Sequence, residues 1–197
     1  MRSRRVGPGG LLTICRFESL FLAVCLAFVA LPVTALADIH QPSTDGVKRL
    51  IKKAERSIKR GKLTEAEDLL RQAVSSDPKD SLAKLKLAFV YVKMRRLIEA
   101  FELSHPIAKA EPKNAYAFAV LGATMLSAGR FRDARLFFVN SLKLDRSESL
   151  AWAGLGMVDF YENDINESLA NLQEAVYRDS LEADYVYALA QVSAPAG

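Results

Sequence analysis

Residues 115–148 read AYAFAVLGATMLSAGRFRDARLFFVNSLKLDRSE, and the following 34 residues repeat the pattern of this stretch. The same spacing of 34 runs backwards through the chain without a slip in register. The equivalent positions are Ala66, Ala100, Ala134 and Ser168; Ala54, Ala88, Gly122, Gly156 and Ala190; Leu63, Leu97, Phe131 and Ile165; and Pro78, Pro112, Arg146 and Ser180. A period of this length is typical of an array of helix–turn–helix units.

The pattern predicts eight helices in four pairs and one further helix at the end. The expected ranges are 47–60 and 63–76, 81–94 and 97–110, 115–128 and 131–144, 149–162 and 165–178, and then 182–193. Within 47–60, apolar residues at helical spacing form one face, and basic residues fill most of the remainder. The sequence therefore predicts an all-α fold, with repeats near 47–80, 81–114, 115–148 and 149–182 and a partial repeat over 183–193.

Glycines mark two of the turns inside the pairs. Gly61 and Gly129 fall where a positive φ is easiest for glycine, and Asn163 at the fourth turn tolerates that conformation. Arg95 at the second turn does not adopt it cheaply, so this turn is expected to differ. Pro106 lies inside the second helix of the second repeat, where we expect a kink rather than an end, because Ile107 still follows the core pattern.

Two stretches carry a family resemblance. Phe118-x2-Leu121-Gly122 with Ala134-x3-Phe138 resembles the tetratricopeptide repeat pattern, and so does Trp152-x2-Leu155-Gly156 with Ser168-x3-Leu172. The resemblance spans roughly residues 47–192. It implies a right-handed superhelical solenoid of antiparallel helix pairs, with a concave groove lined by the first helix of each repeat. It also implies a protein that binds other proteins rather than an enzyme.

The N-terminal segment has the pattern of a secretory signal peptide. Basic residues precede an unbroken apolar run over 20–31, Pro32 follows, and Ala35-Leu36-Ala37 gives a small-x-small cleavage pattern. We therefore assign 1–37 as the signal peptide, 38–46 as a linker and 194–197 as a tail, and expect an exported, periplasmic or otherwise extracytoplasmic protein. The alternative is an uncleaved membrane anchor. Both cysteines, Cys15 and Cys25, lie in this segment, so cleavage would leave no thiol for a disulfide or a metal site.

Charge is distributed unevenly along the chain. The first 37 residues hold four of the 27 basic side chains but only one of the 23 acidic ones, so the remainder is nearly neutral and an overall case for nucleic-acid binding fails. Basic side chains gather in the first helix, and acidic ones dominate from Asp145 onward. The candidate basic patch consists of Lys48, Arg49, Lys52, Lys53, Arg56, Lys59 and Arg60. It is interpreted either as a solvated outer face or as a surface for an anionic partner.

No pattern in the sequence indicates catalysis, a metal site or a cofactor. His40 and His105 are too few and too far apart for a histidine metal site. Carboxylates at Asp159, Glu162, Asp164 and Glu167 straddle a helix–turn–helix corner, which favours a solvated turn over a calcium loop. Asp159 is interpreted as a locally tolerated polar residue.

The resemblance also implies which residues line the groove. The candidates are Ile51, Leu82, Leu85, Phe89, Tyr116, Met157 and Tyr161. Such a surface suits a peptide or helix with apolar anchors. The alternative is that Leu85 and Phe89 pack inside a tight superhelix.

The resulting hypothesis is an exported scaffold or adaptor that docks one or more proteins in the periplasm or cell envelope. The alternative is an N-terminal docking module of a larger envelope enzyme or assembly factor. The apolar helix over 182–193 has no partner helix in the sequence, so self-association through it is a further expectation.

Overall fold

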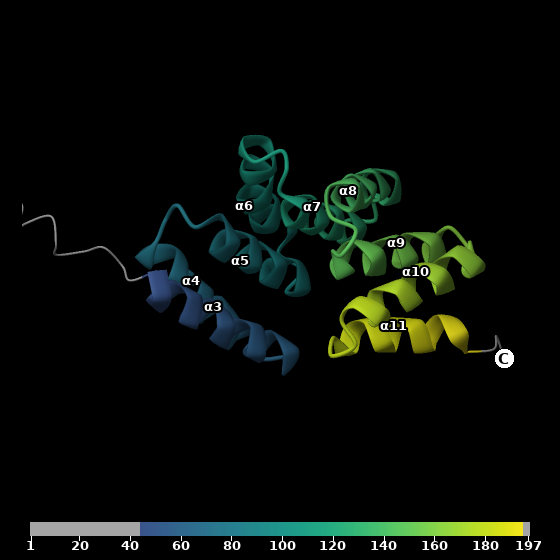
Figure 1. Ribbon diagram of the computed structural model, residues 1–197, viewed down its shortest axis with the longest axis horizontal. Helices are drawn as coiled ribbons and strands as arrows, with labels where there is room; N and C mark the ends of the chain where they lie inside the picture. Colours follow the sequence, from purple (N-terminus) through teal and green to yellow (C-terminus); the bar gives the residue numbers. More distant parts are fainter. Residues whose placement is uncertain (1–43, 195–197) are drawn as a thin grey trace, which may run out of the picture. The chain divides into compact units, whose positions relative to one another are not determined.

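The computed structural model describes residues 44–194, and in this part of the chain all regular structure is helical (Figure 1). The described residues belong to one compact unit. The all-α prediction is confirmed. The predicted signal peptide, both cysteines, His40, residues 38–43 of the predicted linker and residues 195–197 of the tail lie outside the described residues.

Nine helices make up the described residues. They are α3 (Thr44–Lys59), α4 (Leu63–Ser76), α5 (Ser81–Lys93), α6 (Leu97–Ala110), α7 (Ala115–Ser127), α8 (Phe131–Leu144), α9 (Ser149–Tyr161), α10 (Ile165–Arg178) and α11 (Ala183–Ser193). The bounds agree closely with the 34-residue period. The largest difference is at the start: α3 begins at Thr44, so residues 44–46 of the predicted linker are helical. Asp45 in the first turn favours this start, because a carboxylate is stabilised at a helix N-terminus.

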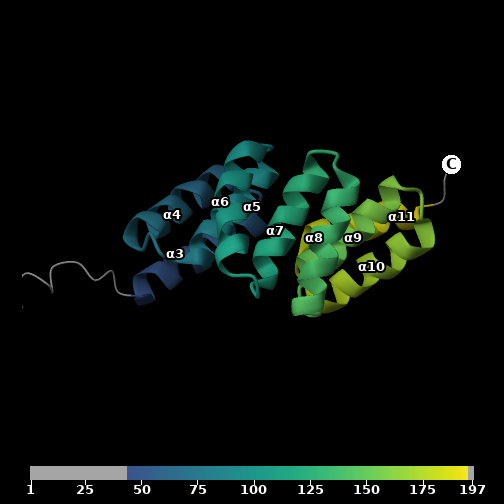
Figure 2. The same cartoon turned by 90° about the horizontal axis from the view of Figure 1, so that it is seen from above.

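Consecutive helices pair as predicted. α3 packs on α4, α5 on α6, α7 on α8 and α9 on α10, and α11 follows on α10. The first helices of successive repeats also lie against one another, with α3 on α5, α5 on α7, α7 on α9 and α9 on α11 (Figure 2). The inner side of the solenoid is therefore built from α3, α5, α7, α9 and α11. The second helices, α4, α6, α8 and α10, cover the outer side.

Small residues let the two helices of a repeat approach each other. The ring of Phe138 on α8 lies so close to α7 that a methyl group on Gly122 would stand 2.6 Å from it. A methyl group on Gly154 of α9 would overlap the same ring. Leu172 occupies the equivalent place against Gly156 in the fourth repeat. Phe138 therefore lies fully buried between glycines of two consecutive repeats.

All four turns within the pairs share one backbone conformation, so the expectation that the second turn differs is wrong. The φ angles are 71° at Gly61, 62° at Arg95, 74° at Gly129 and 68° at Asn163. The N–H of Arg96 donates to the carbonyl of Tyr91 at 2.8 Å. The residues that follow Gly61, Gly129 and Asn163 make the same backbone hydrogen bond in their own turns. This hydrogen bond closes the C-terminus of the helix and holds Arg95 in the left-handed region. The Arg95 side chain is exposed, so only its backbone is constrained.

Pro106 does not end α6, which continues to Ala110. Ile107, directly after the proline, is buried in the core. This agrees with the prediction that the helix passes through the proline. Packing of α6 outweighs the backbone hydrogen bond that a proline removes.

Candidate functional site: the inner groove

The inner side of the solenoid holds two adjoining hollows that share Phe89, Leu150, Glu182 and Tyr185. Their volumes are about 290 Å³ and about 310 Å³. We call the two together the inner groove. Helices α3, α5, α7, α9 and α11 all contribute to its walls. The groove therefore depends on how the first helices of all the repeats curve around a common space.

The first hollow is polar. Lys86 lies at its centre, with its Nζ 2.8 Å from Glu55 Oε1 of α3 and 4.8 Å above the ring of Tyr116 of α7. Glu148, the residue that caps the N-terminus of α9, also lines it and accepts a hydrogen bond from the N–H of Leu150 at 3.3 Å. This hollow presents carboxylates, the two ammonium groups of Lys59 and Lys86, and aromatic edges within a small space.

Burial raises the pKa of three groups in the first hollow, of which Tyr116 is one. It raises the pKa of Glu148, and the Leu150 N–H and the charge of Lys86 offset only part of that rise. It also raises the pKa of Tyr185, against a hydrogen bond with Ser149 that acts in the opposite direction. All three shifts report an environment in which a negative charge is poorly solvated.

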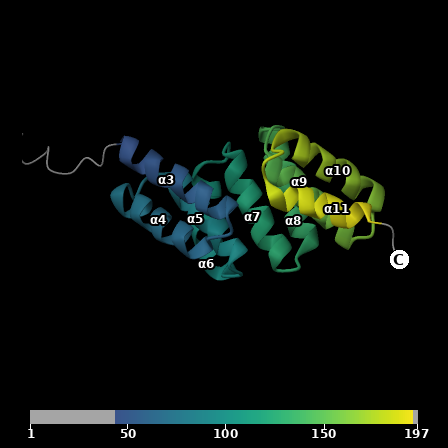
Figure 3. The same cartoon turned by 90° about the horizontal axis from the view of Figure 1, so that it is seen from below.

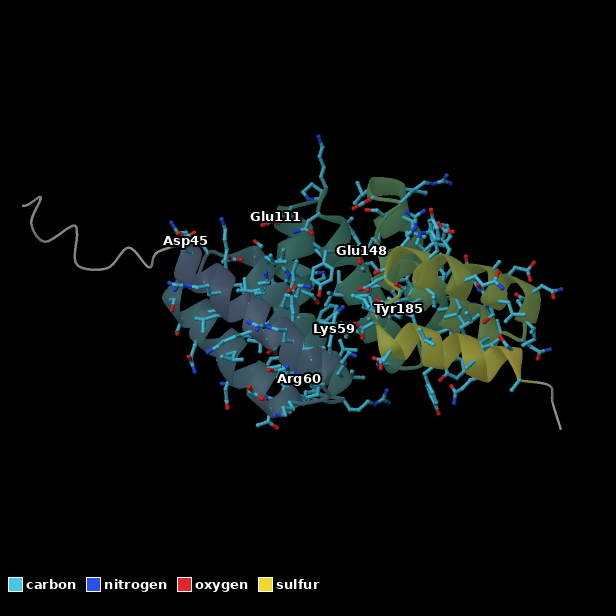
Figure 4. The ribbon with its side chains drawn as sticks, turned by 60° about the horizontal axis from the view of Figure 1, so that its bottom comes forward. Asp45, Lys59, Arg60, Glu111, Glu148 and Tyr185 are labelled. Carbon is cyan, nitrogen blue, oxygen red and sulfur yellow. The ribbon has the colours of Figure 1, made fainter. Side chains whose placement is uncertain are left out.

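The two ends of the solenoid meet across the groove. Lys59 Nζ at the end of α3 lies 3.7 Å from Asp179 Oδ2, just after α10. Lys93 of α5 lies 3.7 Å from Glu182 and also pairs with Asp184 at the start of α11. Figure 4 shows Lys59, Glu148 and Tyr185 around this junction, while Asp45 lies at the far end of α3. Basic residues of the first half thus bind acidic residues of the second half within one chain.

The second hollow is mostly apolar. Its walls are Phe89 and Lys93 of α5, Ala123 and Leu126 of α7, Phe138 of α8, Leu150, Ala153, Gly154 and Met157 of α9, Glu182 before α11, and Asp184, Tyr185, Tyr187, Ala188 and Gln191 of α11. Seen from below in Figure 3, α11 lies in front of α9 and α10. The last helix is therefore a wall of the groove.

The predicted groove residues separate into three sets. Phe89 and Tyr116 line the first hollow, and Phe89 and Met157 line the second. Ile51 and Leu85 are only 5% and 1% exposed, so they belong to the core and do not contribute an accessible surface. In the second repeat, Leu85 is thus packed inside the superhelix, whereas Phe89 lines the groove.

The remaining two candidates are exposed but line neither hollow. Leu82 lies near the start of α5, and Tyr161 is the last residue of α9. The Tyr161 ring stacks on Phe131 of α8, with the ring centres 5.0 Å apart.

The candidate basic patch is exposed along α3. All seven of its side chains, at positions 48, 49, 52, 53, 56, 59 and 60, lie at the surface. Lys59 forms the ion pair with Asp179 described above. The opposite face of α3 is buried through Val47, Ile51, Ala54 and Ile58. The helix is therefore amphipathic, as its sequence indicates.

Several groove residues were not identified from the sequence. They include Glu148, Tyr185, Lys93 and the acidic group Asp179, Glu182 and Asp184. A signal for Glu148 was present, because Asp80, Asn114 and Glu148 stand 34 apart and each caps the N-terminus of a first helix. No local signal indicates that the two ends meet, because that depends on the curvature of the array.

Asp159 is buried, at 2% exposure, and is not part of a solvated turn. Arg135 of α8 lies 2.8 Å from its Oδ1, and Asn171 of α10 donates to its Oδ2 at 2.6 Å. Arg135 also pairs with Glu162. Asp159 thus links the outer helices of two consecutive repeats, and a buried carboxylate needs such partners.

Within residues 44–194 there is no group of three or more histidine, cysteine or carboxylate side chains placed to hold a metal ion. His105 stacks on Phe101, with the ring centres 4.9 Å apart. Among the described helices, none is both long and apolar enough to cross a lipid bilayer.

Comparisons with known proteins agree with the resemblance seen in the sequence. Residues 57–124 match the tetratricopeptide repeat family. A comparison with curated proteins found no match. Solved structures that share the fold include TTC0263, a thermophilic TPR protein of Thermus thermophilus, with a TM-score of 0.64 at 16% identity over 74% of this chain and 80% of that one.

Two further solved structures are similar to this chain. The anaphase-promoting complex assembly Cut9–Hcn1 matches with a TM-score of 0.61 at 16% identity, over 90% of this chain and 33% of that one. Pseudomonas aeruginosa pilF matches with a TM-score of 0.56 at 17% identity, over 75% of this chain and 68% of that one. At these identities the likeness shows the fold alone.

Proposed function

Because this chain carries tetratricopeptide repeats, we propose that it is a protein-binding scaffold whose inner groove holds a segment of a partner protein. The observation that carries the proposal is the second hollow, an apolar space of about 310 Å³ that is bounded by first helices of consecutive repeats and by α11. Apolar and aromatic walls with a few charged groups at one end fit a peptide or helix with an apolar anchor.

The charged groups of the first hollow favour one sign of charge on the partner segment. The first hollow, next to the apolar one, contains Glu148, and its carboxylate is poorly solvated. A cationic side chain of the partner would gain from that carboxylate, and an anionic one would not. We therefore expect a partner segment with an apolar anchor followed by Lys or Arg.

The test is affinity capture with the full chain as bait. Met157→Lys places a charge in the apolar hollow and is expected to abolish capture of proteins that the wild-type chain retains. Leu136→Lys is the matched control, because Leu136 is exposed on α8 of the outer side. Circular dichroism checks that both variants fold. Equal capture by Met157→Lys and wild type would count against the groove.

The cellular compartment is a separate proposal. The segment 1–37 supports export to the periplasm or another extracytoplasmic space, through its basic start, apolar run and Ala35-Leu36-Ala37. Fractionation of cells, with N-terminal sequencing of the recovered chain, tests it. A chain that begins at Asp38 in the periplasmic fraction is the expected result, and an intact chain in the cytosol would contradict it.

An anionic surface is a second proposed partner. The seven exposed basic side chains of the patch, six on α3 and Arg60 directly after it, support it, because exposed charges of one sign attract an anionic surface at low salt. Binding to vesicles containing an anionic lipid is expected to fall sharply with salt and with Lys48→Glu/Lys52→Glu. The control Lys109→Glu/Lys113→Glu changes two exposed lysines elsewhere and is expected to have a smaller effect. Equal loss in both double variants would argue against a role for α3.

The alternative proposal is that the same solenoid is the docking module of a longer envelope protein. It leaves the groove unchanged and requires further coding sequence after Gly197. Reading the gene beyond that codon distinguishes the two. Self-association through the C-terminal helix concerns the outer face of α11, whose Tyr187 and Gln191 also border the second hollow of the groove.

A further inference from the structure

Apart from Asp184 at its edge, the outer face of α11 is exposed and uncharged. Its other exposed residues are Ala183, Val186, Tyr187, Ala190, Gln191, Ser193 and Ala194, of which Tyr187 and Gln191 also border the second hollow. Val186 is 46% exposed and Tyr187 66% exposed. The acidic residue of this helix, Asp184, pairs with Lys93. A helix face without charge is unusual at a protein surface and indicates contact with another apolar surface.

In the complete repeats the corresponding face of the first helix is covered. Ala190 is equivalent to Ala54, Ala88, Gly122 and Gly156. All four of these are buried, whereas Ala190 is exposed. In the third and fourth repeats this small residue receives a large side chain from the second helix, Phe138 against Gly122 and Leu172 against Gly156. Among the described residues, no second helix comes after α11 to fill this place (Figure 3).

The same face of α11 also carries the pattern of a second helix. Three of the four second helices share a pattern of buried residues: a small residue at position i, a large one at i+4 and a small one at i+7. These are Ala66, Leu70 and Ala73 in α4, Ala134, Phe138 and Ser141 in α8, and Ser168, Leu172 and Ala175 in α10. In α11 the series is Ala183, Tyr187 and Ala190. All nine equivalents in α4, α8 and α10 are buried, while the three in α11 are exposed.

We propose that α11 pairs with α11 of a second copy of this chain, each helix packing on the other as the two helices of a repeat do. The two helices of a repeat are antiparallel, and an antiparallel pair of identical helices has two-fold symmetry. If Tyr187 of each copy enters the place over Ala190 of the other, the symmetry axis falls between positions 188 and 189. That point is the middle of Ala183–Ser193, so the two helices overlap along their full length.

The size of the contact sets its strength. Helix α11 has 11 residues and is about 16 Å long. A pair of such helices buries less than the roughly 800 Å² per partner of a standard interface. Tyr177 at the end of α10 and Leu181 before α11 are also strongly exposed. The proposed dimer is therefore weak and depends on concentration.

Sedimentation velocity of the full chain, over roughly two decades of concentration around the micromolar range, tests the proposal. Wild type is expected to shift from monomer to dimer as concentration rises. Tyr187→Lys is expected to remain a monomer. Leu136→Lys is the matched control, since Leu136 is 64% exposed, close to the value for Tyr187, and it is expected to dimerise like wild type. A wild-type chain that stays monomeric throughout overturns the proposal.

A mixing experiment tests the register of the pair. Ala190→Glu alone is expected to be monomeric, because the new carboxylate would face Tyr187 of the partner copy. A mixture of Tyr187→Lys with Ala190→Glu is expected to form a one-to-one dimer, because the two opposite charges then meet. Failure of the mixture to dimerise while both variants remain helical overturns the pairing. If Tyr187→Lys still associates, the contact lies elsewhere in the chain and the proposed pairing is wrong. The pairing is also wrong if Leu136→Lys abolishes the dimer.

Discussion

The left-handed backbone conformation costs Arg95 free energy that Gly61 and Gly129 avoid and that is smaller for Asn163. The left-handed conformation costs a non-glycine residue about 1–2 kcal/mol, and Arg95 has a φ of 62° with an exposed side chain. Arg95→Gly is therefore expected to stabilise the fold by about 0.5–1 kcal/mol, part of the gain being lost to the flexibility of glycine in the unfolded chain. For a unit of this size that is a rise in Tm of a few degrees, measured by thermal unfolding.

The control for Arg95→Gly is Arg132→Gly. Arg132 is exposed in α8, where glycine lacks the advantage of a positive φ. It is expected to lower stability by about 1 kcal/mol. A decrease in Tm for both variants would show that Arg95 makes stabilising contacts that outweigh its backbone.

Gly154 is a second residue whose type is set by one neighbour. A Cβ there would overlap the ring of Phe138, which is fully buried. Gly154→Ala is expected to destabilise the fold by about 1–3 kcal/mol. Because the cause is one ring, Phe138→Leu in the same chain should recover part of that loss in a double-mutant cycle of denaturant unfolding. Additive losses would indicate that the clash is not with Phe138.

At the scale of the helix, the N-terminus of α9 shows how capping and burial oppose each other. Glu148 caps α9 from a position where α5 has Asp80 and α7 has Asn114. Its side chain lies in the first hollow, and burial raises its pKa. A carboxyl whose pKa is higher in the folded state costs stability at neutral pH, and that cost disappears as pH falls below the pKa of the unfolded chain.

Glu148→Gln removes this cost and keeps an oxygen that can accept the Leu150 N–H. The variant is expected to be more stable than wild type at pH 7, with the difference shrinking to nothing below about pH 4. Thermal unfolding of both chains across that range measures it. Glu111→Gln is the control with the opposite sign, because hydrogen bonds from Ser81 and Asn114 lower the pKa of Glu111 and stabilise its charged form. A constant difference for Glu148→Gln at all pH values would mean that charge is not the cause.

The helices themselves could be predicted from the sequence because each depends on local spacing. Every predicted range reappears with bounds shifted by at most three residues, since small residues at a period of 34 and the turn residues fix both register and ends. The conformation of Arg95 was missed because backbone hydrogen bonds in the turn outweigh its propensity. Local sequence patterns thus determine where helices begin and end, while backbone hydrogen bonds can decide the conformation of a single residue such as Arg95.

The groove could be predicted only in part, for a geometric reason. Phe89, Tyr116 and Met157 line it, whereas Ile51 and Leu85 are buried. Which side of a first helix stays open depends on small rotations between repeats, which sum along the array. These rotations follow from packing of whole side chains and are not visible in spacing. The same holds for Tyr185, whose place in the groove results from the curvature of four repeats.

At the scale of the whole unit, the contact between its ends responds to salt. Lys59 and Asp179 are both partly exposed, and exposed ion pairs contribute little to stability and weaken with ionic strength. Spin labels at Arg60→Cys and Leu181→Cys, in a Cys15→Ser/Cys25→Ser background, report the separation of the ends by pulsed EPR. The distance distribution is expected to broaden at high salt and in Lys59→Glu. Labels at Lys113→Cys, just before α7, and Lys143→Cys, near the end of its partner helix α8, should show no change.

A distribution that stays narrow in both conditions would contradict this role for the ion pair. The apolar packing of α11 against α9 and α10 would then hold the ends together without help from charge.

The ion pairs that join Lys59 to Asp179 and Lys93 to Glu182 have a consequence for how the chain folds. In most repeat arrays each unit contacts only its neighbours, so folding can start anywhere and spread, and parts of the array can open alone. Here the first and second repeats also touch the segment after the fourth. Such contacts between distant parts of the sequence raise the contact order, so their formation is a late and slow step of folding. Once made, they couple the opening of one end to the opening of the other, and because the Lys59–Asp179 pair is exposed and screened by salt, this coupling is strongest at low ionic strength.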